Sequence, residues 1–191
     1  MENSFFAIMS RMKLISRWSL MRSTRNESLM EHSAEVAIIG EALGFIKNEY
    51  FGGRVDVQKI SSLALYHDVN EVVSGDLPTP IKYYNKKMES AYHEIEGEIC
   101  ERMIFSLPEK LRDDYKSYLT PDTDSEEYKI MKAADKLSAF VKCVEEKASG
   151  NHDFDCAYET IKKSLKELKM SEVDFFIETF LDGYGKPLDV L

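Results

Sequence analysis

Four side chains have the types and the spacing of a divalent metal site. His67 and Asp68 stand side by side, with His32 upstream and Asp135 downstream. Imidazole and carboxylate ligands without thiolates favour Mn, Fe, Co, Zn or Mg in a nearly octahedral site. Such a site leaves positions for water and substrate, lowers the pKa of bound water and polarises a phosphoryl oxygen. The pattern therefore favours an enzyme. We name these residues the four-ligand group: His32, His67, Asp68 and Asp135.

The alternative is that the four are unrelated polar residues, each hydrogen-bonded to its own neighbours. A single inward-facing histidine is more often a hydrogen-bonded core residue than a metal ligand. Asp68, however, follows a nearly continuous apolar run, where an unpartnered carboxylate is costly. Asp135 stands in the middle of a helical pattern that disfavours aspartate. Neighbouring helical residues diverge by about 100°, so one ion must lie between His67 and Asp68 or near the helix end. One ion explains all four residues together.

The elements that must position these residues are helices, because nearly every segment has apolar residues at helical spacing. Strand-like alternation and internal repeats are absent from the sequence. Two prolines and a glycine within residues 74–80 predict a loop. The sequence thus predicts an all-α helical bundle, with residues 1–191 as a single domain. The expected helices cover residues 4–17, 28–49, 56–67, 86–105, 126–148, 153–168 and 171–181, with another opened by Pro108.

Composition narrows the function further. The net charge of −9 and the lack of a basic stripe argue against a nucleic acid partner. A small phosphate ester remains possible, because a metal ion reverses the local charge. Cys100, Cys143 and Cys156 are scattered and indicate free buried thiols in a reducing cytoplasm. No apolar stretch approaches the roughly 20 residues of a membrane span, so we expect a soluble cytoplasmic protein.

The order of the four-ligand group resembles that of the HD superfamily of metal-dependent phosphohydrolases. A closer resemblance, to bacterial HD-domain 5′-deoxynucleotidases, rests on residues 10–18, 31–33, 66–68 with Glu71, and 75–83. It implies hydrolysis of deoxyribonucleoside 5′-monophosphates to deoxynucleoside and phosphate, with one divalent metal ion held by the four-ligand group. It also implies a homodimer, for which the apolar helix faces at Phe175, Phe176 and Phe180 offer a surface.

The same resemblance implies roles around the metal. Glu71 would assist proton transfer near the metal-bound water, and it shares the ligand face if the helix continues to it. Arg17, at the end of the first helix, would hold the nucleotide. Trp18 would press against the sugar near C2′ and exclude a 2′-hydroxyl. Without the resemblance, Trp18 is best interpreted as a core residue. The alternative for Glu71 is an exposed glutamate at a helix end that makes a surface ion pair.

The remaining predicted substrate contacts lie in or just after the predicted loop. His32 is predicted to contact the substrate as well as the metal ion. Asp76 would bind the 3′-hydroxyl, although aspartate after glycine is also common in plain turns. Thr79 and Lys82 are expected on the phosphate side. Three rival functions remain: an HD phosphohydrolase for another nucleotide ester, a non-catalytic nucleotide-binding HD domain, and a helical interaction protein with an incidental metal.

Overall fold

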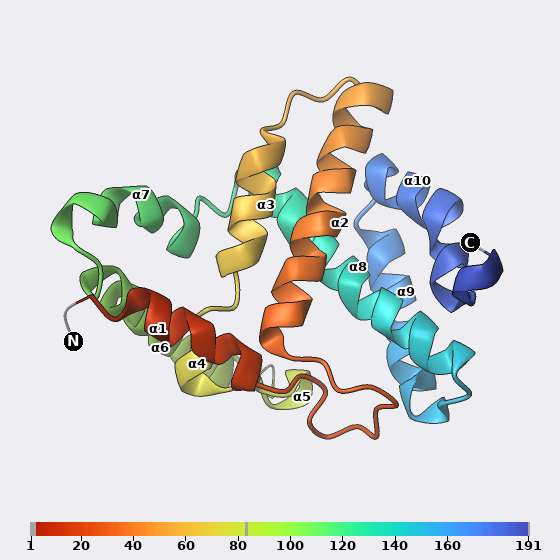
Figure 1. Cartoon of the computed structure of the whole chain (residues 1–191), viewed down its shortest axis with the longest axis horizontal. Coiled ribbons are helices and arrows are strands. Elements are labelled where there is room, and N and C mark those ends of the chain that lie inside the picture. Colours follow the sequence, from red (N-terminus) through yellow and green to blue (C-terminus); the bar gives the residue numbers. More distant parts are fainter. Residues whose placement is uncertain (1–2, 83, 191) are drawn as a thin grey trace.

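The computed structural model describes residues 3–82 and 84–190, apart from the side chains of Thr79 and Pro80, and it is built from helices (Figure 1). Within these residues no β-strand forms; an isolated bridge joins Ser16 and Ser28. The predicted all-α fold is confirmed.

Three helices form the centre of the fold: α2 (Leu29–Tyr50), α3 (Val57–Tyr66) and α8 (Glu126–Ala148). Figure 1 shows α2 and α3 side by side, with α8 crossing behind them. A Cβ added at Gly40 of α2 would lie 3.0 Å from the Ile60 side chain on α3. The glycine therefore lets these two helices approach closely. Val36, Leu43, Leu137 and Phe140 complete the buried contact with α8.

Side-chain caps start these helices where the sequence predicts. Ser28 caps α2 by accepting from the Glu31 N–H, and the Glu31 carboxylate accepts from the Ser28 N–H in return. Ser125 caps α8 through the Tyr128 N–H. Each cap satisfies a backbone donor that the first helical turn leaves free.

Further helices flank this centre on two sides (Figure 1). On one side, a second buried apolar cluster joins the start of α2 to α1 (Phe5–Met9), η1 (Ser10–Leu14), α6 (Lys86–Phe105) and α7 (Glu109–Leu119). On the other side lie α9 (Asp155–Glu167) and α10 (Ser171–Phe180). The short elements are α4 (Glu71–Ser74), α5 (Thr79–Lys82), η2 (His152–Phe154), η3 (Leu181–Gly185) and η4 (Leu188–Val190).

The expected helix over 4–17 is confirmed as far as Leu14, although its second part is a 3-10 helix, and is wrong over residues 15–17. The chain leaves η1 at Leu14, and Ile15 is extended. The reason is a tertiary pairing, because the Ile15 carbonyl accepts from the Leu29 N–H and the Arg17 N–H donates to Glu27. Arg17 and Trp18 therefore lie on a loop, not at a helix end.

Two other boundaries also differ. The helix expected to reach His67 ends at Tyr66, and tight turns span residues 67–70 before α4 begins at Glu71. The predicted loop over 74–80 ends earlier, because α5 begins at Thr79. Pro80 is compatible with this helix because a first-turn N–H needs no partner.

No helix in the described part of the chain is long and apolar enough to span a membrane. All three cysteines are free thiols, as predicted. Cys100 and Cys143 are buried, whereas Cys156 is exposed, which corrects the expectation of three buried thiols.

Candidate metal centre and active site

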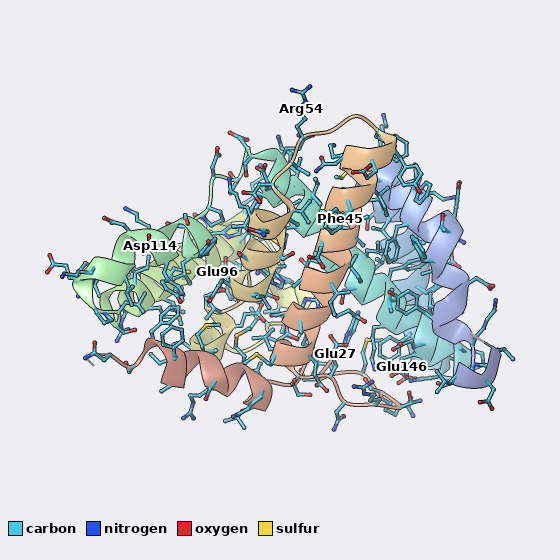
Figure 2. All side chains as sticks on the ribbon, turned by 45° about the horizontal axis from the view of Figure 1, so that its top comes forward. Glu27, Phe45, Arg54, Glu96, Asp114 and Glu146 are labelled. Carbon is cyan, nitrogen blue, oxygen red and sulfur yellow. The ribbon has the colours of Figure 1, made fainter. Side chains whose placement is uncertain are left out.

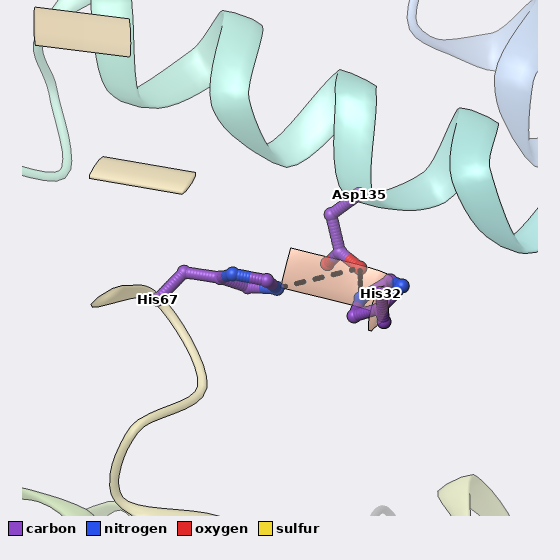
Figure 3. A group of neighbouring side chains, drawn as sticks. All are labelled: His32, His67 and Asp135. Carbon is purple, nitrogen blue, oxygen red and sulfur yellow. Dashed lines mark hydrogen bonds and ion pairs between the residues drawn. The ribbon is translucent and has the colours of Figure 1, made fainter. Parts of the chain in front are cut away.

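Three of the four predicted ligands converge from three helices. Figure 3 shows His32 of α2, His67 at the end of α3 and Asp135 of α8 pointing at one another. Their ligand atoms all lie within 4.8 Å of one another. Asp135 Oδ1 lies 3.2 Å from His32 Nε2 and 3.7 Å from His67 Nε2. Residues separated by more than 100 positions thus meet in the arrangement that the sequence predicts.

Asp68 completes the group from the side of the two histidines. Its Oδ2 lies 3.0 Å from His67 Nε2 and 3.8 Å from His32 Nε2. The turns after α3 allow two neighbouring residues to face one point, because they rotate the chain out of a regular helix. All four predicted ligands are therefore in one cluster.

The hydrogen bond of His67 fixes which of its nitrogens faces this cluster. Nδ1 lies 2.7 Å from the Ala64 carbonyl oxygen. A carbonyl only accepts, so Nδ1 carries a hydrogen and the Nε2 lone pair is left for a ligand. His67 Nε2 is buried, and its neighbours are the carboxylates of Asp68 and Asp135, with neither of which it makes a well-aligned hydrogen bond. A buried imidazole nitrogen that faces carboxylates in this way suits a metal bond.

His32 reaches the same tautomer by another route. Its Nδ1 lies 3.2 Å from Ser138 Oγ, and the Ser138 hydroxyl donates to Glu35 Oε2 at 2.6 Å. Because the single hydroxyl hydrogen points to Glu35, the serine oxygen accepts from His32 Nδ1. Glu27 Oε1, 3.5 Å from Nδ1, favours the same hydrogen. His32 Nε2 is therefore also directed at the cluster.

This arrangement needs a positive charge at its centre. Two imidazole nitrogens and two carboxylates face one another at 3.0–3.8 Å, a geometry that is repulsive unless a metal ion stands among them or a proton on an imidazole takes its place. Two nitrogen and two oxygen donors without a thiolate fit a borderline or hard divalent ion. The residues present therefore fit a single divalent metal ion.

The pKa values of the four-ligand group also indicate that positive charge is favoured between its carboxylates. Burial lowers the pKa of His67, but Asp68 and Asp135 outweigh it and raise that pKa to about 10. Burial and the nearby Arg17 lower the pKa of His32 to about 4. Burial opposes ionisation of Asp135, yet Lys132, 2.6 Å from its Oδ2, and both histidines hold its pKa well below the usual range. A metal ion therefore competes with a proton at His67 Nε2.

Glu71 lies beside this cluster, at the start of α4, with only 6% of its surface exposed. Its Oε2 is buried without a hydrogen-bond partner in the described structure. Burial, followed by repulsion from Asp68 and Asp76, raises its pKa to about 9. An unpartnered carboxyl next to a candidate metal site has the chemistry of a proton carrier.

Arg17 supplies a second positive side chain beside the predicted ligands, in addition to Lys132. Its Nη1 lies 3.6 Å from Asp68 Oδ2, and its Nε lies 3.2 Å from Glu27 Oε1. Burial lowers the pKa of Arg17, but Asp68, Asp135 and Asp76 outweigh it and raise the pKa. Burial raises the pKa of Asp76, with Arg17 opposing. Arg17 therefore lies beside the predicted ligand Asp68, and Asp76 lies close enough to Arg17 and Asp68 for their charges to act on it.

The other predicted substrate residues are placed differently. Trp18 has a left-handed backbone (φ 56°), and its ring lies 5.2 Å from that of buried Phe154. Lys82 does not point freely into the site, because its Nζ donates to Glu96 Oε1 at 3.0 Å. Thr79 begins α5, and its side chain lies outside the described part of the structure.

The sequence interpretation missed the groups that hold the ligands in place: Glu27, Glu35, Lys132 and Ser138. Three of them carried a usable signal. Glu35 follows His32 by three positions, Ser138 follows Asp135 by three, and Lys132 precedes Asp135 by three, so each shares a helix face with a ligand. Their meeting across two helices depends on how α2 packs against α8, which no local pattern specifies.

A hollow of about 340 Å³ lies on the Nδ1 side of His32. Its lining includes Glu27, Glu31, Glu35 and Lys142 but not Arg17, Glu71 or Asp76. Several carboxylates there disfavour a phosphate group. Among the predicted substrate residues whose side chains the structure describes, His32 alone lines this hollow.

Comparisons of the sequence with known proteins agree over nearly its whole length. The model of a family described as 5′-deoxynucleotidase YfbR-like matches residues 4–184. A 5′-deoxynucleotidase of Vibrio cholerae is 44% identical over 189 residues, which are 98% of this chain and 97% of that protein. The 5′-deoxynucleotidase YfbR of an Escherichia coli strain is 42% identical, covering 98% of this chain and 95% of that protein.

Solved structures share the fold. An HD-domain phosphohydrolase of Listeria innocua superposes with a TM-score of 0.83 at 24% identity, covering 95% of this chain and 88% of that one. A cyanophage S-2L HD phosphohydrolase, bound to dA and one catalytic Zn²⁺ ion, gives a TM-score of 0.64 at 19% identity, covering 93% and 96%. With the match of the family model and these sequence relatives, the chain belongs to the YfbR-like 5′-deoxynucleotidase family.

Proposed function

We propose that the four-ligand group holds one divalent metal ion and that this ion serves the family's reaction. As a member of this family, the chain is a metal-dependent phosphomonoesterase that hydrolyses deoxyribonucleoside 5′-monophosphates to deoxynucleoside and phosphate. The observation that carries the metal proposal is the shared tautomer of His32 and His67, whose Nε2 atoms face carboxylates. The Zn²⁺ and dA in the cyanophage structure support it.

When bound, the ion would activate water and offset negative charge on the phosphoryl group. The protein side chains do the rest. Arg17 binds the nucleotide through charge-assisted hydrogen bonds, and Asp76, held near it, accepts from the sugar 3′-hydroxyl. Trp18 stands near C2′ and leaves no partner for a 2′-hydroxyl. Glu71 takes up or delivers a proton through its unpartnered Oε2.

The test compares phosphate release from dAMP and AMP. Protein stripped with a chelator is refilled separately with Mn, Co, Zn or Mg, and the activity identifies the metal that supports turnover. We expect metal-dependent release from dAMP and little from AMP. Release from neither substrate with any metal would reject the proposal, and equal release from both would reject the role of Trp18.

A substitution at Glu71 separates metal binding from chemistry. We expect Glu71→Ala to bind the metal as the natural chain does and to lose about 100-fold or more in kcat, as expected for a lost proton-transfer group. Glu49→Ala, at an exposed position near the end of α2, is the matched control. Turnover of Glu71→Ala close to that of this control contradicts the assignment.

We also propose that the chain acts in the cytoplasm as a homodimer without a nucleic acid partner. Its free thiols and net charge of −9 support the location and the lack of a polyanionic partner. Phe176 is buried in the core and is not available for a dimer contact. The side chains available for a dimer contact are exposed ones on α2 and α10, namely Ile38, Phe45 and Phe180. Light scattering on the same preparation measures the oligomeric state.

A further inference from the structure

The segment that carries Glu71 and Asp76 is held at both ends by one side chain of α6. Asn70 Nδ2 donates to Glu96 Oε1 at 3.0 Å, and Lys82 Nζ donates to the same oxygen at 3.0 Å. Asn70 immediately precedes Glu71, and Lys82 ends α5. A single carboxylate oxygen therefore sets the separation between the two ends of residues 70–82.

Glu96 can hold both ends of the segment because its side chain and those of its partners are largely shielded from solvent. The Asn70 residue is 5% exposed, and the Glu96 and Lys82 side chains are 21% and 20% exposed. The second oxygen of Glu96 lies 2.9 Å from His93 Nδ1. Burial lowers the pKa of Lys82, but Glu96 outweighs it and raises that pKa. Charge-assisted hydrogen bonds in such a setting are stronger than those of neutral groups.

The same face of α6 also contacts the middle of the segment. Tyr92, one turn before Glu96, is buried, and its ring lies 4.4 Å from Lys82 Nζ. Its hydroxyl is 3.4 Å from Ser74 Oγ at the end of α4. Figure 2 labels Glu96 among the side chains of this region. Three points of the segment thus rest on one helix face.

Between these anchors the chain is irregular. Gly75 has φ 75°, a conformation that favours glycine, and Asp76 and Leu77 lie outside any helix. The position of Asp76 is therefore set by the elements on either side of it, α4 and α5, and both are held by α6.

We propose that Glu96 is a positioning residue for the reaction, acting through Asn70 and Lys82 to place Glu71 and Asp76 against the four-ligand group. This inference rests on the proposed function. It also gives Lys82 a role different from the predicted phosphate contact, because the ammonium group is used to anchor α5. Tyr92 supports the same anchor, because its ring lies against the Lys82 ammonium group.

The test compares Glu96→Ala and Glu96→Gln with Glu98→Ala, an exposed position on the same helix. Hydrogen exchange of residues 70–82 in the metal-loaded protein is measured first, followed by metal affinity, kcat and KM for dAMP. In Glu96→Ala we expect faster exchange in this segment and a kcat lower by about 10- to 100-fold, since small misplacements of reacting groups are costly. Metal affinity stays unchanged, because no ligand is anchored by Glu96.

Glu96→Gln keeps an oxygen that accepts from Asn70 and Lys82, so we expect it to recover part of both losses. Unchanged exchange and kcat in Glu96→Ala would overturn the inference. So would a Glu96→Ala variant whose kcat falls while the exchange of residues 70–82 stays unchanged, because the segment would then be held without Glu96. The exchange measurement needs no substrate, and a natural chain that fails to hydrolyse dAMP therefore rejects the proposed function separately.

Discussion

At the scale of single residues, two histidines present the same nitrogen to the site for different reasons. The tautomer of His67 is fixed by a backbone carbonyl, that of Ala64, which no side-chain substitution removes. The tautomer of His32 depends on two side chains, Ser138 and Glu35. The orientation of His32 can therefore be altered by a substitution at a residue that is not itself a predicted metal ligand.

We accordingly expect Ser138→Ala to weaken metal binding by about tenfold, because His32 Nδ1 loses its nearest acceptor and the ring is less well held. Calorimetric titration of the stripped protein with Co or Mn measures this directly. Ser61→Ala on α3, where the hydroxyl donates only to the Val57 carbonyl, is the control. An unchanged Kd in Ser138→Ala shows that Glu27 suffices to orient His32.

Trp18 combines a left-handed backbone with a ring packed on Phe154, so the structure holds the indole in one place at some conformational cost. We expect Trp18→Ala to lower the preference for dAMP over AMP by about tenfold or more, because space opens beside C2′. The ratio of kcat/KM for the two substrates measures the effect. Leu20→Ala, at an exposed position in the same loop, is the control. An unchanged ratio leaves Trp18 only a packing role.

At the scale of elements, the loop that carries Arg17 and Trp18 is fastened to the C-terminal half of α8. Glu146 is the centre of this contact, since it accepts from the Thr24 backbone and hydroxyl, from Asn151 and from Lys142. Lys142 in turn donates to the Arg25 carbonyl at 2.8 Å. Figure 2 shows Glu146 and Glu27 close to this loop at the same end of the molecule.

This contact makes the loop sensitive to acid. Burial opposes ionisation of Glu146, but Lys142 and the other donors outweigh it and lower its pKa to about 2. A carboxylate with a lowered folded-state pKa stabilises the fold above its unfolded pKa, and the contribution disappears as pH falls from about 4.5 toward 2. The contribution of Glu146 to the free energy of unfolding at neutral pH is on the order of 1–3 kcal/mol.

Unfolding in urea between pH 7 and pH 3 tests this in the natural chain and in Glu146→Gln. We expect the variant to be less stable at pH 7 and the difference to shrink steadily below about pH 4. Glu159→Gln, at an exposed position on α9, should match the natural chain at every pH. A difference that stays constant down to pH 3 contradicts the assigned pKa.

At the scale of the whole molecule, the sequence predicts the long helices well because their signals are local. Apolar spacing and capping residues such as Ser28 and Ser125 place α2 and α8 within about one residue. It misses the extended stretch after Leu14, because the pairing with residues 27–29 is a tertiary contact. The turns after Tyr66 are missed as well, although they allow His67 and Asp68 to face one ion.

In the site, too, residues with a local sequence signal were predicted, and residues that depend on tertiary contacts were missed. The four-ligand group was found because His and Asp are unusual on apolar helical faces, and the structure brings all four together. Glu35, Glu96 and Ser138 were not found, since glutamate and serine are ordinary on a helix and their partners come from other helices. The roles of Arg17, Glu71 and Asp76 remain predictions whose positions suit them.

The distance along the chain between His32 and Asp135, 103 residues, has a thermodynamic consequence. An ion bound to both acts as a reversible cross-link between the first and last thirds of the polypeptide, and it exists only when the helices are packed. Folding and metal loading are then one linked equilibrium, with about 2.7 kcal/mol gained when free metal is 100 times its Kd. The melting temperature of this enzyme therefore reports the free metal concentration around it.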